Sequence, residues 1–240
     1  MNTRKSKVKI EWSASFAYAI GLIASDGNIS TNGRNFNLTS KDLENVENFR
    51  QCLGVDNKIG LKSRGGSEEK KYFCIQIGDI NFCDFLNSIG LTKNKSKSIQ
   101  KVDVPYEFFR DFLRGCHDGD GSIYYFIHPE SRKPQYRLSF ASASPSFLEW
   151  MKQNISLHLG ITGGWVGPSK GCHMLRYAKS DSLRILNFMY YVGVRYFLSR
   201  KYQTALQCAG DVMVAMRALG ARAVRRGGSS PLPRTTEIGN

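Results

Sequence analysis

The feature that most constrains this 240-residue chain is a nine-residue segment that occurs twice. Residues 19–27 read AIGLIASDG and residues 113–121 read LRGCHDGDG, so Asp26 aligns with Asp120 at an offset of 94 residues. Each copy is a helix-like stretch that ends on Asp-Gly. Because an internal repeat of this kind is the mark of a duplicated supersecondary unit, the sequence predicts two copies of one fold.

The segments that follow each motif also correspond. Residues 40–54 match residues 144–160 in helical pattern, and residues 82–91 match residues 183–194. Polar turn signals between alternating runs indicate hairpins, as at Asn32-Gly33 in the first copy. Each copy therefore reads helix, hairpin, helix, hairpin, helix, an α+β unit of about 100 residues. The predicted divisions are a basic arm at 1–11, a first repeat at 12–104, a second repeat at 105–208, and a C-terminal helix with a disordered tail at 209–240.

Charge and cysteine usage limit the classes of protein to consider. The chain has 34 Lys and Arg against 20 Asp and Glu, a formal net charge of +14, which favours a polyanionic partner such as nucleic acid or an anionic membrane. No apolar run approaches the ~18 residues of a membrane span, and the N-terminus lacks the apolar region of a signal peptide. Six cysteines without a C-x-x-C pair support neither a zinc ribbon nor a disulfide framework. We expect a protein that is not secreted, located in the cytoplasm with the nucleoid or in an organelle.

The two Asp-Gly endings allow two interpretations. Taken singly, Asp-Gly is common where a helix stops and glycine supplies the positive φ of the cap. A carboxylate is nevertheless unfavourable at the C-terminal end of a helix dipole, and here it is placed there twice. If the helices pack side by side through Gly21 and Gly115, Asp26 and Asp120 meet and raise each other's pKa unless a metal neutralises them. Mg²⁺ prefers such oxygen ligands, and paired carboxylates with metal fit an in-line displacement at phosphorus.

These residues also resemble a known family. AIGLIASDG and FFRDFLRGCHDGDGS (108–122) resemble the two signature helices of the LAGLIDADG homing endonucleases in their single-chain, two-repeat form. The resemblance covers residues 12 to 205, and Ala24 stands where the signature has its first acid. It implies an α+β fold of two pseudo-symmetric αββαββα repeats that pack through their motif helices, with antiparallel sheets forming a DNA-binding saddle.

The resemblance implies an enzyme: a divalent-metal-dependent endonuclease that hydrolyses phosphodiester bonds. Its substrate would be double-stranded DNA at a long asymmetric site, cut in both strands to leave short 3′ overhangs. It would be encoded by a mobile intron and act as a monomer. The cofactor implied is Mg²⁺ or Mn²⁺, bound by Asp26 and Asp120 with main-chain carbonyls at Ser25 and Gly119 contributing.

The resemblance also gives roles to residues near the metal site. The segments KNKSKS (93–98) and FLSRKY (197–202) fall where the family has lysines, so Lys97 and Lys201 are expected to form a pseudo-symmetric catalytic pair. A solvated basic helix start is the alternative for both. Asp118, the other acid of the second motif, takes a structural role in the family.

The expected DNA contacts follow from strand alternation. Phe36 and Leu38 would face the core in one strand and Tyr136, Leu138 and Phe140 in another, which leaves polar neighbours on the outer face. A β-ribbon fits the major groove, where Asn, Gln, Arg and Lys hydrogen-bond base edges. The residues expected to contact DNA are Arg34, Asn35, Asn37, Thr39, Lys62, Arg64, Lys71, Gln76, Arg132, Lys133, Gln135, Arg137, Ser139, Lys170 and Arg176.

Two other functions stay open at this point. The fold also serves RNA-binding intron maturases with weak or no nuclease activity, whose partner would be the protein's own intron RNA. A regulator that kept the DNA saddle without chemistry is the third reading. Retention of both Asp26 and Asp120 favours cleavage.

Overall fold

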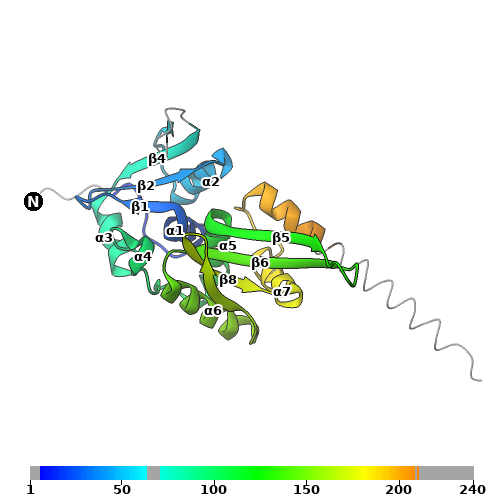
Figure 1. Cartoon of the computed structure of the whole chain (residues 1–240). Coiled ribbons are helices and arrows are strands. Elements are labelled where there is room, and N and C mark those ends of the chain that lie inside the picture. Colours follow the sequence, from blue (N-terminus) through cyan, green and yellow to red (C-terminus); the bar gives the residue numbers. More distant parts are fainter. Residues whose placement is uncertain (1–5, 64–70, 209, 211–240) are drawn as a thin grey trace, which may run out of the picture.

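The computed structural model describes residues 6–63, 71–208 and 210. It contains two four-stranded antiparallel sheets with the strand orders β1-β2-β4-β3 and β5-β6-β8-β7. In both sheets the first strand of the repeat lies at one edge and the third strand at the other. The expected α+β architecture of two αββαββα repeats is therefore confirmed. Figure 1 shows the first repeat in blue and cyan beside the second in green and yellow.

The elements follow the predicted order in both repeats. The first repeat consists of α1 (Ala14–Asp26), β1 (Gly27–Ile29), β2 (Asn35–Ser40), α2 (Leu43–Leu53), β3 (Ile59–Lys62), β4 (Tyr72–Gly78), α3 (Ile80–Ser88) and the single turn α4 (Lys95–Ser98). The second consists of η1 (Tyr106–Phe108), α5 (Phe109–Asp120), β5 (Gly121–Ile127), β6 (Pro134–Ser142), α6 (Pro145–Leu159), β7 (Trp165–Ser169), β8 (Cys172–Tyr177) and α7 (Lys179–Met189). Residues 199–208 are also helical.

Local sequence explains where these elements begin and which side they bury. The Ser13 hydroxyl accepts a hydrogen bond from the Phe16 amide and so caps α1. In β2, Phe36 and Leu38 are buried while the residues before and between them are half-exposed, as the alternation predicted. The turn between β1 and β2 has Gly33 at φ 68°, a conformation that glycine adopts without strain.

The motif helices α1 and α5 pack backbone against backbone in the middle of the molecule (Figure 1). A Cβ atom on Gly21 would lie 2.9 Å from both the Cys116 amide nitrogen and the Gly115 Cα. A Cβ on Gly115 would lie 3.0 Å from the Gly21 Cα. Only glycine at both positions permits this approach, and α1 is buried continuously from Phe16 to Ala24.

Some predictions fall outside the described residues. The basic arm is described only from residue 6, Arg64 lies outside, and of the C-terminal segment 209–240 only residue 210 is described. In the described part of the chain, no helix is both long and apolar enough to span a membrane. None of the six cysteines, which all lie among the described residues, forms a disulfide bond.

Candidate metal and nucleic-acid site

The structure brings the two motif aspartates into one cavity. Asp26 and Asp120, at the adjacent ends of α1 and α5, both line a cavity of about 300 Å³. Ser25 lines the same cavity, and a Cβ on Gly119 would lie 3.3 Å from the Asp26 Oδ2. The four residues expected to hold metal are therefore neighbours, two from each repeat.

The glycine after each aspartate does not form a left-handed cap. Gly27 has φ −81° and ψ 152°, and Gly121 has φ −83° and ψ 161°, both extended. The interpretation of Asp-Gly as a positive-φ helix cap is therefore wrong. Glycine is needed because a Cβ would lie 2.6 Å from the Ile23 Cα in one copy and 2.6 Å from the His117 Cα in the other. The chain thus passes directly from each helix into the first strand of its sheet, with the carboxylate at the junction.

A buried lysine binds the chain after each aspartate. The Lys95 ammonium donates to the Gly27 carbonyl at 2.7 Å, and the Lys201 ammonium donates to the Gly121 carbonyl at 2.8 Å. These carbonyls are equivalent in the two repeats, so the pseudo-symmetric pair is Lys95 and Lys201. Lys97 is exposed, and the structure does not bring it to the carboxylates. Two residues of helix rotate a side chain by about 200°, so in the one-turn α4 Lys95 faces inward and Lys97 faces solvent.

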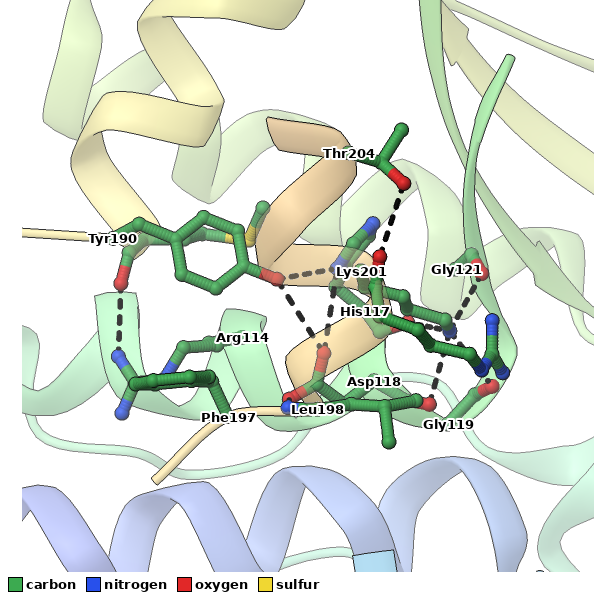
Figure 2. A network of polar contacts seen from close by, with 12 residues as sticks. Arg114, His117, Asp118, Gly119, Gly121, Tyr190, Phe197, Leu198, Lys201 and Thr204 are labelled. Atoms are coloured by element: carbon green, nitrogen blue, oxygen red, sulfur yellow. Dashed lines mark hydrogen bonds and ion pairs between the residues drawn. The ribbon is translucent and has the colours of Figure 1, made fainter. Parts of the chain in front are cut away.

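The two buried lysines differ in their surroundings. Lys95 lines the cavity with both aspartates. Lys201 instead closes the end of α5 (Figure 2), donating to the carbonyls of His117 at 2.5 Å, Asp118 at 2.9 Å and Gly119 at 3.3 Å as well as to that of Gly121. It supplies the positive charge that the C-terminal end of a helix prefers.

Burial lowers the pKa of Lys95 to about 8, against the opposing effect of the Asp120 and Asp26 carboxylates. Burial likewise lowers the pKa of Lys201 to about 8, opposed first by Asp118. In the unfolded chain both ammonium groups return to an ordinary pKa of about 10.4. Between these two pKa values the unfolded chain binds more protons, so the contribution of each lysine to the free energy of unfolding rises with pH across this window.

The lowered pKa of these two lysines can be measured by NMR titration of ¹³C-labelled lysine. We expect two side-chain signals with midpoints near pH 8, well below the ordinary lysine pKa of about 10.4. Lys95→Met removes one of the two signals, and the matched variant Lys97→Met removes neither. A Lys95 signal with its midpoint at the ordinary lysine pKa of about 10.4 would contradict its buried position.

Asp118 ties the second motif to distant segments and does not line the cavity. Its Oδ2 accepts hydrogen bonds from the Tyr18 hydroxyl at 2.9 Å and the Leu198 amide at 2.8 Å. Its Oδ1 accepts one from the Tyr190 hydroxyl at 3.5 Å (Figure 2). One buried carboxylate thus joins α1 and α5 to the segment that leads to Lys201.

The donor set of the cavity suits a hard divalent cation. Among the described residues, no group of three or more His, Cys, Asp or Glu side chains could hold a metal, so carbonyl, water or substrate oxygens must complete any coordination by the two carboxylates. Mg²⁺ is commonly bound in this way, by one or two carboxylates together with substrate phosphates. The Cys116 thiol also lines the cavity, and burial raises its pKa, but a soft sulfur ligand does not suit a hard cation such as Mg²⁺.

The first sheet continues the site beyond Asp26. Asn37, Thr39 and Lys62 line a second hollow of about 200 Å³ together with Asp26 and Asn28. Sequence reasoning missed Asn28, although it is the first outward position after the motif. The other residues predicted on this sheet are also accessible: Gln76 and Asn35 lie on the same face by register, and Arg34 and Lys71 are exposed near its ends.

The second sheet differs from the prediction at one position. Ser139 is 5% exposed and its hydroxyl lies 2.8 Å from that of Ser122, because a short side chain on the central strand β6 is covered by its neighbours. The expectation that Ser139 stands free on the outer face is therefore wrong. The remaining predicted residues are accessible, with Arg132, Lys133, Arg137 and Lys170 exposed and Gln135 and Arg176 half-exposed.

Comparison with known proteins gives structural matches only. No family model matches the sequence, and neither does any curated protein. I-SmaMI, bound to an uncleaved DNA target in the presence of calcium ions, matches with a TM-score of 0.55 and 13% identity over 90% of this chain and 97% of that one. The I-SmaMI LAGLIDADG homing endonuclease bound to cleaved DNA matches with a TM-score of 0.54 and 13% identity over 92% and 97%.

A second group of matches comes from WhiA. The N-terminal LAGLIDADG domain of DUF199/WhiA has a TM-score of 0.51 and 15% identity, over 78% of this chain and 85% of that one. Full-length DUF199/WhiA from Thermatoga maritima has a TM-score of 0.52 and 14% identity, over 92% and 71%. The likeness at these identities concerns the fold. Two equivalent four-stranded sheets around a pair of glycine-packed motif helices, in a chain that superposes on I-SmaMI and WhiA, show that this protein has the two-repeat LAGLIDADG fold.

Proposed function

We propose that the protein is a site-specific endonuclease that hydrolyses both strands of double-stranded DNA with Mg²⁺ or Mn²⁺. The observation that carries this proposal is the delivery of Asp26 and Asp120, one from each repeat, to a single cavity beside the buried Lys95. Structural neighbours bound to DNA, one of them solved with calcium ions, support a nuclease-like role. The net charge of +14 suits a polyanionic substrate.

The residues of the site have distinct tasks in this reaction. Asp26 and Asp120 would hold the divalent cation, with the carbonyls of Ser25 and Gly119 as further oxygen donors. Such a cation, when bound, polarises the phosphate and lowers the pKa of the attacking water. Lys95 brings a positive charge to the same cavity, where negative charge develops on the phosphate oxygens. Lys201 acts through the main chain by fixing the end of α5, and with it the position of Asp120.

The two sheets would select the target. Their outward side chains differ between the repeats, so the two half-sites differ and the target is asymmetric. Phosphate contacts would give an affinity that falls with salt, and base contacts would specify the site. We propose further that the protein acts as a monomer, is encoded by a mobile intron, and is found with DNA in the nucleoid or in an organelle.

The test is cleavage of DNA that spans the protein's own insertion locus without the insert. With Mg²⁺ we expect both strands to be cut at one place, leaving short 3′ overhangs, and we expect EDTA to stop the reaction. A scrambled duplex of the same composition is the control and should stay intact. Uncut locus DNA, together with specific binding of the protein's own intron RNA, would replace this proposal by the maturase function.

A further inference from the structure

The outer face of the second sheet carries large aromatic side chains. Tyr124 is 60% exposed and Trp165 is 44% exposed, and Phe126 is half-exposed beside them. Their neighbours in sequence, such as Ile123 and Val166, pack against the core, so the aromatic rings stand on the opposite side of the sheet. We call Tyr124, Phe126, Trp165 and Arg137 together the aromatic patch.

The corresponding face of the first sheet carries side chains that form hydrogen bonds. Asn28 lies opposite Asn37, and Asn37 lies opposite Gln76, across β1, β2 and β4. The register of the second sheet places Tyr124 opposite Arg137 and Phe126 opposite Gln135. The two halves of the saddle therefore present different chemistry to a bound duplex.

Two rings of the aromatic patch each turn one face toward the other. Tyr124 and Phe126 stack with centroids 5.5 Å apart and an angle of 27° between their planes. The Arg137 guanidinium lies 5.7 Å from the centroid of Phe126 and 5.9 Å from that of Trp165. These contacts engage part of the ring faces within the patch. Because side chains stand roughly perpendicular to a sheet, the rings present their edges to a partner in front of it.

We propose that the aromatic patch recognises the 5-methyl groups of thymine in the major groove of the half-site bound by the second repeat. This inference rests on the proposed binding of double-stranded DNA. Of the four bases, only thymine displays an apolar methyl group in the major groove, beside the hydrogen-bonding groups that all of them carry. An aromatic edge pressed against a donor or acceptor would leave that group without a partner, so thymine is the base that it tolerates best.

Charge favours DNA as the occupant of this surface. Arg137 belongs to the patch itself, and Arg176 lies opposite Trp165 in the register. Among the described residues that face outward on this sheet, none is acidic. An apolar surface bordered by arginines and uncharged polar side chains fits a polyanion whose groove displays methyl groups.

The fold also fixes where these thymines should lie. β5 begins at Gly121, directly after Asp120, so Tyr124 and Phe126 follow the carboxylate by four and six residues. At about 3.4 Å per strand residue and about 3.4 Å per base pair, the contacts fall about four to six base pairs from the centre of cleavage.

The experiment begins with selection of duplexes from a randomised library by the full-length protein in Ca²⁺, so that binding is measured apart from cleavage. We expect thymine enrichment in one half of the selected site. Uracil, which lacks only the methyl group, is then substituted for each enriched thymine. Each substitution in that half should weaken binding about fourfold, the factor that corresponds to burial of one methylene-sized group, and substitutions in the other half should have no effect.

The double variant Tyr124→Ala/Phe126→Ala should bind the thymine and uracil duplexes equally, whereas Asn37→Ala, on the first sheet, should keep the difference. Equal binding of both duplexes by the unaltered protein would overturn the inference, and so would a uracil effect that survives in the double variant. Tight binding of single-stranded oligo-dT that is lost in the double variant would replace it by stacking on unpaired bases. If no duplex in the library is enriched, the proposed DNA recognition itself is rejected. If a site is enriched but shows no thymine preference, only the inference about the aromatic patch is rejected.

Discussion

Asp26→Asn is expected to reduce metal-dependent DNA cleavage by at least about a thousandfold, because loss of a metal-binding charge removes several kcal/mol of transition-state stabilisation. The substitution keeps the size of the side chain at the junction of α1 and β1, so the fold is preserved. Asp120→Asn should have the same effect from the other repeat, since both carboxylates line one cavity. The measurement is the single-turnover rate of cleavage of the cognate duplex.

Binding provides the control for these variants. Each Asn variant should bind the duplex in EDTA at least as tightly as the unaltered protein, because a negative charge facing phosphate has been removed. Asp103→Asn alters an exposed carboxylate that pairs with Lys101 and should leave the cleavage rate unchanged. Cleavage by Asp26→Asn at the ordinary rate would remove Asp26 from the metal site.

Gly115→Ala is expected to destabilise the protein by about 3 kcal/mol or more, at the upper end of what overpacking of a core costs. The added Cβ would lie 3.0 Å from both the Gly21 Cα and the Leu22 amide nitrogen, and these are backbone atoms that cannot rotate away. For a domain of this size the midpoint of thermal unfolding should fall by about 6–12 °C. Calorimetry of the metal-free protein measures the change.

The sign of the change in the free energy of unfolding separates the effect of packing from that of helix propensity. Alanine is a better helix former than glycine by about 1 kcal/mol, so propensity alone would make Gly115→Ala stabilising. Gly60→Ala is the control, because nothing lies within 4 Å of the position that its Cβ would take. A Gly115→Ala protein as stable as the unaltered one would show that α1 and α5 do not pack as closely as described.

The sequence was most informative where it was duplicated. One Asp-Gly ending is most simply explained as an ordinary helix end followed by a turn, but the equivalence of Asp26 and Asp120 across two copies predicted that the residues act together. The same alignment placed Gly21 and Gly115 at the helix contact, where the structure has them. Because each motif position occurs in both repeats, agreement between the two copies supported its role. The two-repeat architecture and the meeting of the two aspartates could both be predicted in this way.

The sequence could not show which lysine of a short helix faces inward, or which side chains from another strand cover a given residue. The segment 93–98 contains lysines at alternate positions, and a single helical turn gives no hydrophobic period from which the inward one could be chosen. That Lys95, and not Lys97, is the lysine that faces inward is therefore known only from its contact with Gly27. Similarly, alternation placed Ser139 outward but could not show that Ser122 covers it.

The contacts of Lys201 have a consequence for the order in which the protein is made. Asp26 and Asp120 emerge from the ribosome well before Lys201, whose ammonium binds carbonyls 80 to 84 residues earlier in the chain. The hydrogen bond from the Leu198 amide to Asp118 likewise cannot form until 80 further residues have been synthesised. A nascent chain therefore carries both carboxylates before it carries the groups that hold them in place. Synthesis itself therefore delays the completion of the site, because the end of α5 is not held in place until residue 201 has left the ribosome.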